Sequence, residues 1–225
     1  MSEKEEKKEA GKKLNDFLEK NRNGLLTCFI LVVVVLLGFL VFEVLNSTVS
    51  KRNLADIDSI FYKMTKGSEA LDENELEARR AEFLEELQPY TKKLGVTGVR
   101  ANIVSAELCY QKGDYSTAIT YWDAAANKDK KAYSAPIANY NKGVCYEQVG
   151  DLDNAALCYK TAAEFEDFIL VNHAKFSYGR VLETQGKYAE AVSVYTELND
   201  ASPDDNWAQL AKTRIIALTV DNKIQ

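Results

Sequence analysis

The side chains that most often carry chemistry are few in this chain of 225 residues. It has one histidine, His173, so neither a histidine-based metal cluster nor an H-E-x-x-H zinc helix can be built. No glycine-rich loop of the kind that cradles phosphate groups occurs. Two pairs of neighbouring acids, Glu85–Glu86 and Asp204–Asp205, fit solvated faces better than paired catalytic carboxylates. We therefore predict a protein that is not an enzyme, with no cofactor, no metal and no small-molecule substrate.

The four cysteines are spaced for packing and not for redox chemistry. Cys28 lies in an uncharged segment, while Cys109, Cys145 and Cys158 are spread over the rest of the chain without a C-x-x-C pair. Free cysteine is often buried as a small apolar residue, and we expect that role for these three. A Cys145–Cys158 disulfide stays open as an alternative, because sequence does not give the Cα separation that a bridge requires.

The elements that position these residues are predicted to be helices. The chain contains only 3 Pro and 11 Gly, and its 46% hydrophobic composition supports a sizeable core. The net charge of −6 gives a nucleic-acid partner no general electrostatic support. Composition therefore favours an all-α protein that does not bind nucleic acid.

An uncharged apolar segment runs from Gly24 to Phe42. As a helix it would span about 28 Å, close to the thickness of the hydrocarbon layer of a membrane. It has no polar face, as a buried core helix usually would, and a cleaved signal peptide would have a shorter apolar run ending at a small-x-small site. We predict that residues 24–45 form a single transmembrane helix.

Basic residues beside this segment predict its orientation. Four lie shortly before it and two shortly after it: Lys12, Lys13, Lys20 and Arg22, against Lys51 and Arg52. The excess of Lys and Arg marks the cytoplasmic side. Residues 1–23 are therefore predicted to be a charged cytoplasmic tail, with the rest of the chain across the membrane.

Three segments of the chain repeat one pattern at intervals of 37 and 36 residues. Each begins with a glycine, followed by an aromatic residue or Leu at +2, an Ala at +5 and an aromatic residue at +9. The glycines are Gly113, Gly150 and Gly186, and the aromatic residues at +9 are Trp122, Tyr159 and Tyr195. The glycine ends one helix in a turn, and the small Ala lets a second helix approach closely. Such hairpins cannot bury their apolar faces alone, so they must stack.

This pattern resembles the tetratricopeptide repeat family. The small, aromatic and closing-proline positions of that family correspond to Gly143, Tyr146, Gly179 and Pro203, whereas the first copy departs with Ala106 and Cys109. The spacing exceeds the usual 34 residues by two or three, which we place in the loops between repeats. The resemblance implies an α-solenoid with three repeats over residues 98–203.

The flanks of the repeats are also predicted to be helical. Residues 206–220 are expected to form an amphipathic helix, within a capping segment 204–225. Residues 50–94 are expected to form two helices broken at Gly67, with Asp72 and Glu75 as a capping pair, within a degenerate hairpin 46–97.

A partner-binding groove is expected on the concave face lined by the first helix of each hairpin. Its candidates, aromatic and aliphatic with scattered charge, are Val104, Glu107, Tyr110, Tyr140, Asn141, Val144, Glu147, Phe176, Arg180 and Glu183, together with Ile103 and Ser177. Such a groove suits a docked peptide or helix, although these residues could instead pack against the neighbouring hairpin. Family members that grip a chaperone's C-terminal carboxylate use Lys, Asn and Arg at positions where only Asn141 matches here, so that role is not expected.

The whole layout resembles the family of YfgM-like ancillary subunits of the SecYEG translocon. The resemblance implies a bacterial inner-membrane protein with a periplasmic repeat domain that helps protein export. Its partners would be translocon subunits, periplasmic chaperones or exported clients. Two alternatives stay open: a scaffold subunit of a cell-envelope machine, such as a flagellar or secretion apparatus, and an organelle receptor facing the cytosol, where reduced cysteines are natural.

Overall fold

The computed structural model describes residues 3–128 and 133–224, and over these residues it contains helices and no strand. The predicted all-α fold is confirmed. The chain forms two compact units, Met1–Arg52 and Asn53–Gln225, and helix α1 (Glu3–Thr65) contributes residues to both. Parts of the predicted tail (1–2), repeats (129–132) and capping segment (225) lie outside the described residues.

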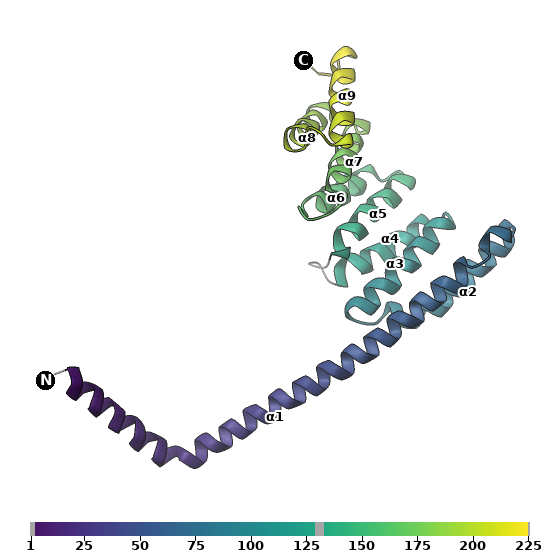
Figure 1. Ribbon diagram of the computed structural model, residues 1–225. Helices are drawn as coiled ribbons and strands as arrows, with labels where there is room; N and C mark the ends of the chain where they lie inside the picture. The colour runs from purple at the N-terminus through teal and green to yellow at the C-terminus, as the bar shows by residue number, and fades with distance from the viewer. Residues whose placement is uncertain (1–2, 129–132, 225) are drawn as a thin grey trace. The chain divides into compact units, whose positions relative to one another are not determined.

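Over the described residues, the first unit is formed by the part of α1 up to Arg52, drawn in purple and blue in Figure 1. By length and composition this helix is a candidate membrane span. Side chains of its most apolar stretch are exposed, and Phe29 and Val35 are 65% and 69% exposed.

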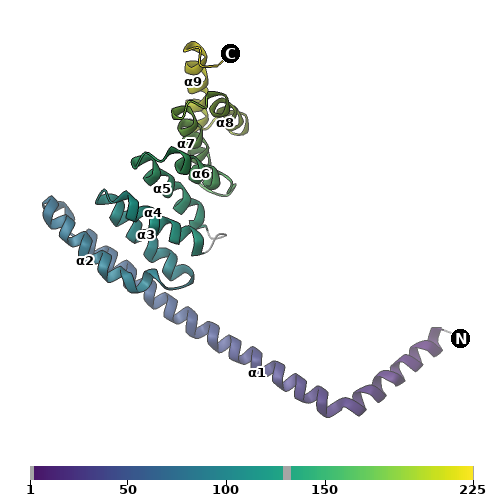
Figure 2. The same cartoon turned by 180° about the vertical axis from the view of Figure 1, so that it is seen from behind.

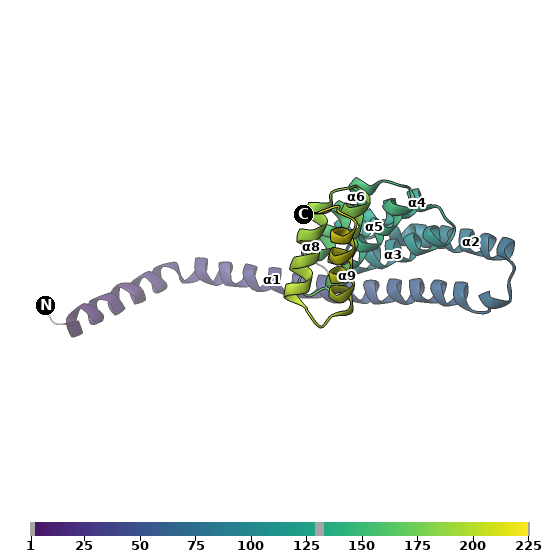
Figure 3. The same cartoon turned by 90° about the horizontal axis from the view of Figure 1, so that it is seen from above.

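The second unit begins with the end of α1, the short 3-10 helix η1 (Ser68–Ala70) and α2 (Glu73–Thr91). The predicted break is confirmed: Gly67 has a φ of 68°, in the left-handed region. The predicted capping pair is also confirmed, because Asp72 Oδ1 accepts from the Glu75 amide at 2.9 Å and Glu75 Oε2 accepts from the Asp72 amide at 3.1 Å. Figure 3 shows the last turns of α1 running beside α2.

The helices of the predicted repeats and of the predicted capping segment follow, each packed antiparallel on the next in chain order. They are α3 (Gly95–Gln111), α4 (Tyr115–Lys128), α5 (Ser134–Gln148), α6 (Leu152–Ala163), α7 (Val171–Thr184), α8 (Tyr188–Ala201) and α9 (Asn206–Val220). Figures 1 and 2 show this succession from opposite sides. The three turn glycines, Gly113, Gly150 and Gly186, have φ values of 74°, 79° and 76°, as predicted for positions where a side chain would be strained.

Small residues let the helices of each hairpin pack closely. Ala118, Ala155 and Ala191, the +5 positions of the three copies, are fully buried. Cys109, Cys145 and Cys158 are buried free thiols, which confirms their predicted packing role and leaves the alternative disulfide unformed. The core is therefore built from small side chains at the helix contacts and large aromatic rings between them.

Candidate functional site

The candidate groove residues lie on the first helices of the three hairpins, α3, α5 and α7, which we call the first-helix face. Most are half-buried, namely Glu107, Tyr140, Asn141, Val144, Glu147, Phe176 and Glu183, while Tyr110 and Arg180 are exposed. Of the two further candidates, Ile103 is half-buried and Ser177 is buried.

Val104 departs from the predicted groove. It is 1% exposed and packs in an apolar cluster with Ile57, Leu87 and Leu108. The reason is that the end of α1 and α2 cover this side of α3 with their own apolar residues. Val104 is a core residue and cannot meet a partner.

Two of the candidate acids are bound to residues of the same chain. The Tyr159 hydroxyl donates to Glu147 Oε2 at 2.7 Å, and Arg180 Nη2 on the next first helix donates to the same oxygen at 2.6 Å. Burial and the neighbouring carboxylate raise the pKa of Tyr159. This Tyr–Glu–Arg set therefore joins the second hairpin to α7.

The next junction repeats the same arrangement. The Tyr195 hydroxyl donates to Glu183 Oε2 at 3.2 Å, and Arg214 Nε on α9 donates to that oxygen at 3.1 Å. Arg214 also donates through Nη2 to the second carboxylate oxygen, which makes the pair bidentate. Glu147, Arg180 and Glu183 thus serve contacts between hairpins.

Tyr140 and Phe176 belong to an aromatic cluster with α9. The Tyr140 hydroxyl lies 2.9 Å from His173 Nε2. The His173 ring stacks on the Trp207 ring, with 3.7 Å between the ring centroids and 8° between the ring planes. The centroids of the Phe176 and Trp207 rings lie 5.4 Å apart. Burial, and secondarily the charge of Arg180, lower the pKa of His173, so the ring favours its neutral form.

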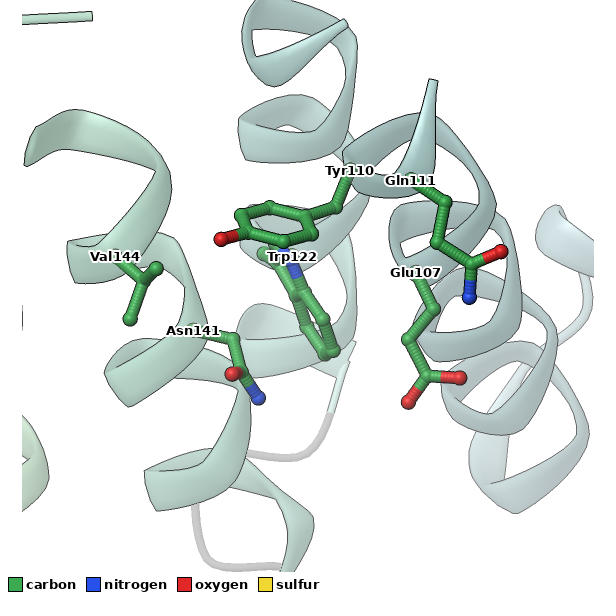
Figure 4. A pocket seen from close by; sticks show the side chains of 6 residues that line it. All are labelled: Glu107, Tyr110, Gln111, Trp122, Asn141 and Val144. Carbon is green, nitrogen blue, oxygen red and sulfur yellow. The ribbon is translucent and has the colours of Figure 1, made fainter. Parts of the chain in front are cut away.

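The other groove candidates surround a pocket between α3 and α5. It has a volume of about 240 Å³ and is lined by Glu107, Tyr110, Gln111, Trp122, Asn141 and Val144, four of which are predicted groove residues. In Figure 4, Glu107 and Gln111 lie on one side, Asn141 and Val144 on the other, and the rings of Tyr110 and Trp122 between them. The structure thus brings together Glu107, Tyr110, Asn141 and Val144 in one site.

The polar groups of this pocket include both hydrogen-bond acceptors and donors, and one of them is a carboxylate. Burial raises the pKa of Glu107, partly offset by the charge of Arg100. The amide nitrogen of Asn141 donates to the Ile137 carbonyl at 3.1 Å, which leaves its amide oxygen as an acceptor. The Trp122 indole N–H has no nitrogen or oxygen acceptor among the described residues. Burial raises the pKa of the Cys145 thiol, and the nearby indole N–H offsets part of that rise.

Sequence reasoning missed Gln111 and Trp122 as pocket residues. Trp122 was assigned to the apolar stripe of a second helix, and its 3% exposure agrees with that packing role. One signal in the sequence sets Trp122 apart: the other two copies have Tyr at this position, Tyr159 and Tyr195.

Comparisons with known proteins agree with this architecture. The family model for the tetratricopeptide repeat matches residues 105–168 and 165–206. A TPR repeat-containing protein of Treponema pallidum (strain Nichols) is 30% identical over 115 residues, which is 51% of this chain. The matched region spans about half of that relative, 48% of its length.

A solved structure of a Rap protein complexed with competence and sporulation factor is 24% identical, with a TM-score of 0.48. The match covers 60% of this chain and 40% of the Rap chain. The family match and the stacked hairpins lead to one conclusion: residues 105–206 of this chain are tetratricopeptide repeats.

Proposed function

We propose that this chain is a membrane-anchored module that binds other proteins through its first-helix face, with the pocket between α3 and α5 as the main contact. The observation that carries the proposal is that this pocket is open, half-apolar and lined by four residues of the predicted groove. Elsewhere on that face, Glu147, Arg180 and Glu183 are taken up by contacts within the chain.

The class of function follows from the repeats. Tetratricopeptide repeats indicate a protein–protein interaction module, because stacked hairpins present a long surface whose residues vary freely on a common fold. A pocket of about 240 Å³ is smaller than the roughly 300–1,000 Å³ typical of small-molecule sites. Its size suits one inserted side chain of a partner.

The proposed setting is the inner membrane of a bacterium. Residues 24–45 would cross it, and the basic residues before the span favour a cytoplasmic N-terminus and a periplasmic repeat domain. In that setting the chain would help protein export by linking the translocon to periplasmic chaperones or exported clients. The resemblance of the whole layout to YfgM-like translocon subunits supports this role.

Two other roles compete with it. A scaffold subunit of an envelope machine would share the topology but would purify with one large complex. A receptor with its repeats in the cytosol would have the opposite topology, and the three reduced, buried thiols are compatible with it.

Topology is tested by thiol labelling in intact cells. An introduced cysteine replaces exposed Asp204, and Cys28→Ser removes background, while the native buried thiols react slowly because burial raises the pKa of each to about 11. Labelling by a membrane-impermeant reagent without permeabilisation supports a periplasmic domain. Labelling only after permeabilisation would contradict both envelope roles.

Partner binding is tested by photocrosslinking in the same cells. A photoreactive phenylalanine derivative is placed at Gln111, which is exposed at the pocket, and at Leu157, which is 60% exposed on second helix α6. Crosslinks from Gln111 to translocon subunits or export clients, absent from Leu157, are expected. Equal crosslinking from both positions would place the partner elsewhere.

A further inference from the structure

We propose that the pocket between α3 and α5 receives an arginine side chain from the partner protein, in the place that an arginine of the chain itself occupies at the two later junctions. The inference rests on the proposed function, since it assumes that a protein partner meets the first-helix face. It adds the chemistry of that partner, which is a basic segment presenting a guanidinium group.

At the two later junctions, α5 with α7 and α7 with α9, an arginine of the chain itself occupies the corresponding space. At each one, a second-helix Tyr donates to a first-helix Glu, and an Arg from the following helix pairs with the same carboxylate. The sets are Tyr159, Glu147 and Arg180, and Tyr195, Glu183 and Arg214.

The junction between α3 and α5 has a different residue at each of the three corresponding positions. Counted from the turn glycine of each copy, Trp122 takes the place of the Tyr at +9 and Tyr110 takes the place of the Glu at −3. Val144 stands where Arg180 stands one copy later, six residues before the turn glycine. Val has no long stem and no charge, so the volume that Arg180 occupies next to α5 is left as a pocket next to α3.

The pocket retains a negative charge for an incoming cation. Glu107 lies one turn before Tyr110 on α3 and makes no hydrogen bond or ion pair with any residue that the structure describes. Arg100, the nearby cation that acts on it, donates to Asp58 at 3.1 Å. Among the residues that the structure describes, no cation lines the pocket, and Glu107 is the one charged residue of its lining.

The rest of the lining suits a guanidinium better than an ammonium or an anion. The ring of Tyr110, which is 38% exposed, offers a face on which a planar cation can stack, with the buried Trp122 behind it. The Asn141 amide oxygen is free to accept, and Val144 can contact the aliphatic stem. An anionic partner is disfavoured, since the whole chain carries −6 and residues 1–23 contribute +1, which leaves −7 for the remainder.

The first test uses N-acetyl-arginine amide as the probe with the full chain in detergent micelles. The chain has 2 Trp, so 5-fluorotryptophan labelling gives one ¹⁹F signal from Trp122 at the pocket and one from Trp207 as an internal control. We expect a saturable shift of the Trp122 signal alone. N-acetyl-citrulline amide, which has the same shape without the charge, should bind about tenfold more weakly or not at all.

Two variants locate the binding. Glu107→Gln removes the charge and should weaken the arginine probe about tenfold, the size expected for a lost charge-assisted contact. Val144→Arg supplies the side chain that Arg180 supplies at the next junction, so it should fill the pocket and abolish binding with the helical content unchanged. Glu190→Gln, an exposed acid on α8, is the matched control and should change nothing.

The outcomes separate this inference from the proposed function. Equal binding of arginine and citrulline, no shift at Trp122, or full binding by both pocket variants would overturn the arginine assignment. If Gln111 still crosslinks a partner and neither variant weakens that crosslink, the protein-binding function stands and the inference fails. If the arginine probe binds but Gln111 captures no protein in cells, the proposed function fails instead.

Discussion

The ring of Tyr195 lies directly against Gly179, so that a Cβ atom at the glycine would stand 2.4 Å from Tyr195 Cε1. The same relationship holds one copy earlier, where a Cβ at Gly143 would stand 3.0 Å from Tyr159 Cε1. Each ring is buried, and each hydroxyl is bound to the glutamate four residues after the glycine. The tyrosine is thus fixed at its ring by the glycine and at its hydroxyl by the acid.

Gly179→Ala is therefore expected to destabilise the repeats by about 1–3 kcal/mol, the usual cost of overpacking a filled core. The Tyr195 ring cannot retreat without losing its hydrogen bond to Glu183. Gly143→Ala should cost less, because its clash is milder. The measurement is urea denaturation of the full chain in a mild detergent, followed by circular dichroism.

Gly24→Ala is the control for this pair, since nothing lies within 4 Å of a Cβ at that position. It should leave the unfolding free energy of the repeats unchanged. A Gly179→Ala protein as stable as this control would contradict the close packing of ring on backbone.

The three buried thiols should resist modification and should link stability to alkaline pH. Burial raises the pKa of Cys109, Cys145 and Cys158 from the ordinary value of 9.0 to about 11. Thiolate is the reactive form, so at about pH 8 a disulfide reagent should modify these residues slowly in the folded protein and rapidly in denaturant. Thiol release measured by absorbance checks this result.

The sign of the stability change follows from the same shifts. A folded-state pKa above the unfolded value contributes stability that is fully present below the unfolded pKa, near 9, and is lost as pH rises towards 11. The free energy of unfolding should therefore fall between about pH 9 and pH 11. Cys109→Ala should make the fall in unfolding free energy with pH less steep. An unchanged slope in that variant would contradict the assignment of this fall to the buried thiols.

Local features of the fold were predictable because each rests on few neighbouring residues. A glycine at a turn and the Asp72–Glu75 capping pair are set by backbone geometry within one turn of helix, and the structure places each where the sequence predicts it. The cysteines were predictable for a different reason, since an isolated thiol without a redox partner usually packs in a core.

Features that depend on distant residues were less predictable. Val104 was assigned to the groove from its register, but the end of α1 and α2 bury it, and their apolar positions lie outside the repeat pattern. The pocket could be predicted only by comparing the copies with one another. It lies where Trp122, Tyr110 and Val144 stand at positions that hold Tyr, Glu and Arg in the later copies. The four pocket residues that were predicted follow from the repeat register of the first helices. That register does not show which pair of neighbouring first helices leaves a pocket and which is filled by an arginine of the chain.

The degenerate hairpin formed by the end of α1 and α2 is expected to be part of the cooperative repeat unit. Leu87 is fully buried in the cluster that contains Ile57 and Val104. Leu87→Ala should cost about 2–5 kcal/mol and lower the Tm of the whole unit in one transition. Leu94→Ala, at a residue that is 88% exposed, should stay within about 0.5 kcal/mol of the parent chain. A Leu87→Ala protein with an unchanged Tm would show that this hairpin folds separately.

The single histidine should make the repeats less stable in mild acid. Burial, and to a smaller extent the charge of Arg180, lower the pKa of His173 below its ordinary value of 6.5. The ring is stacked on Trp207, and its Nε2 atom lies 2.9 Å from the Tyr140 hydroxyl. A lowered folded-state pKa contributes stability that is present above about 6.5 and is lost as pH falls through the folded pKa. Protonation would also bring a second positive charge near Arg180. The free energy of unfolding should thus decline as the pH falls below about 6.5, and His173→Gln should remove that part of the decline.

An untagged chain has one histidine, so its Cε1 proton gives one NMR titration curve. Its midpoint should lie below 6.5 in the folded protein and return towards 6.5 in denaturant, where the Trp207 stack and the Tyr140 contact are lost. Trp207→Ala should expose the ring to water and raise the midpoint while Arg180 stays in place, since burial is the larger of the two causes. A folded midpoint at or above 6.5 would mean that the ring is solvated and that α9 does not cover it.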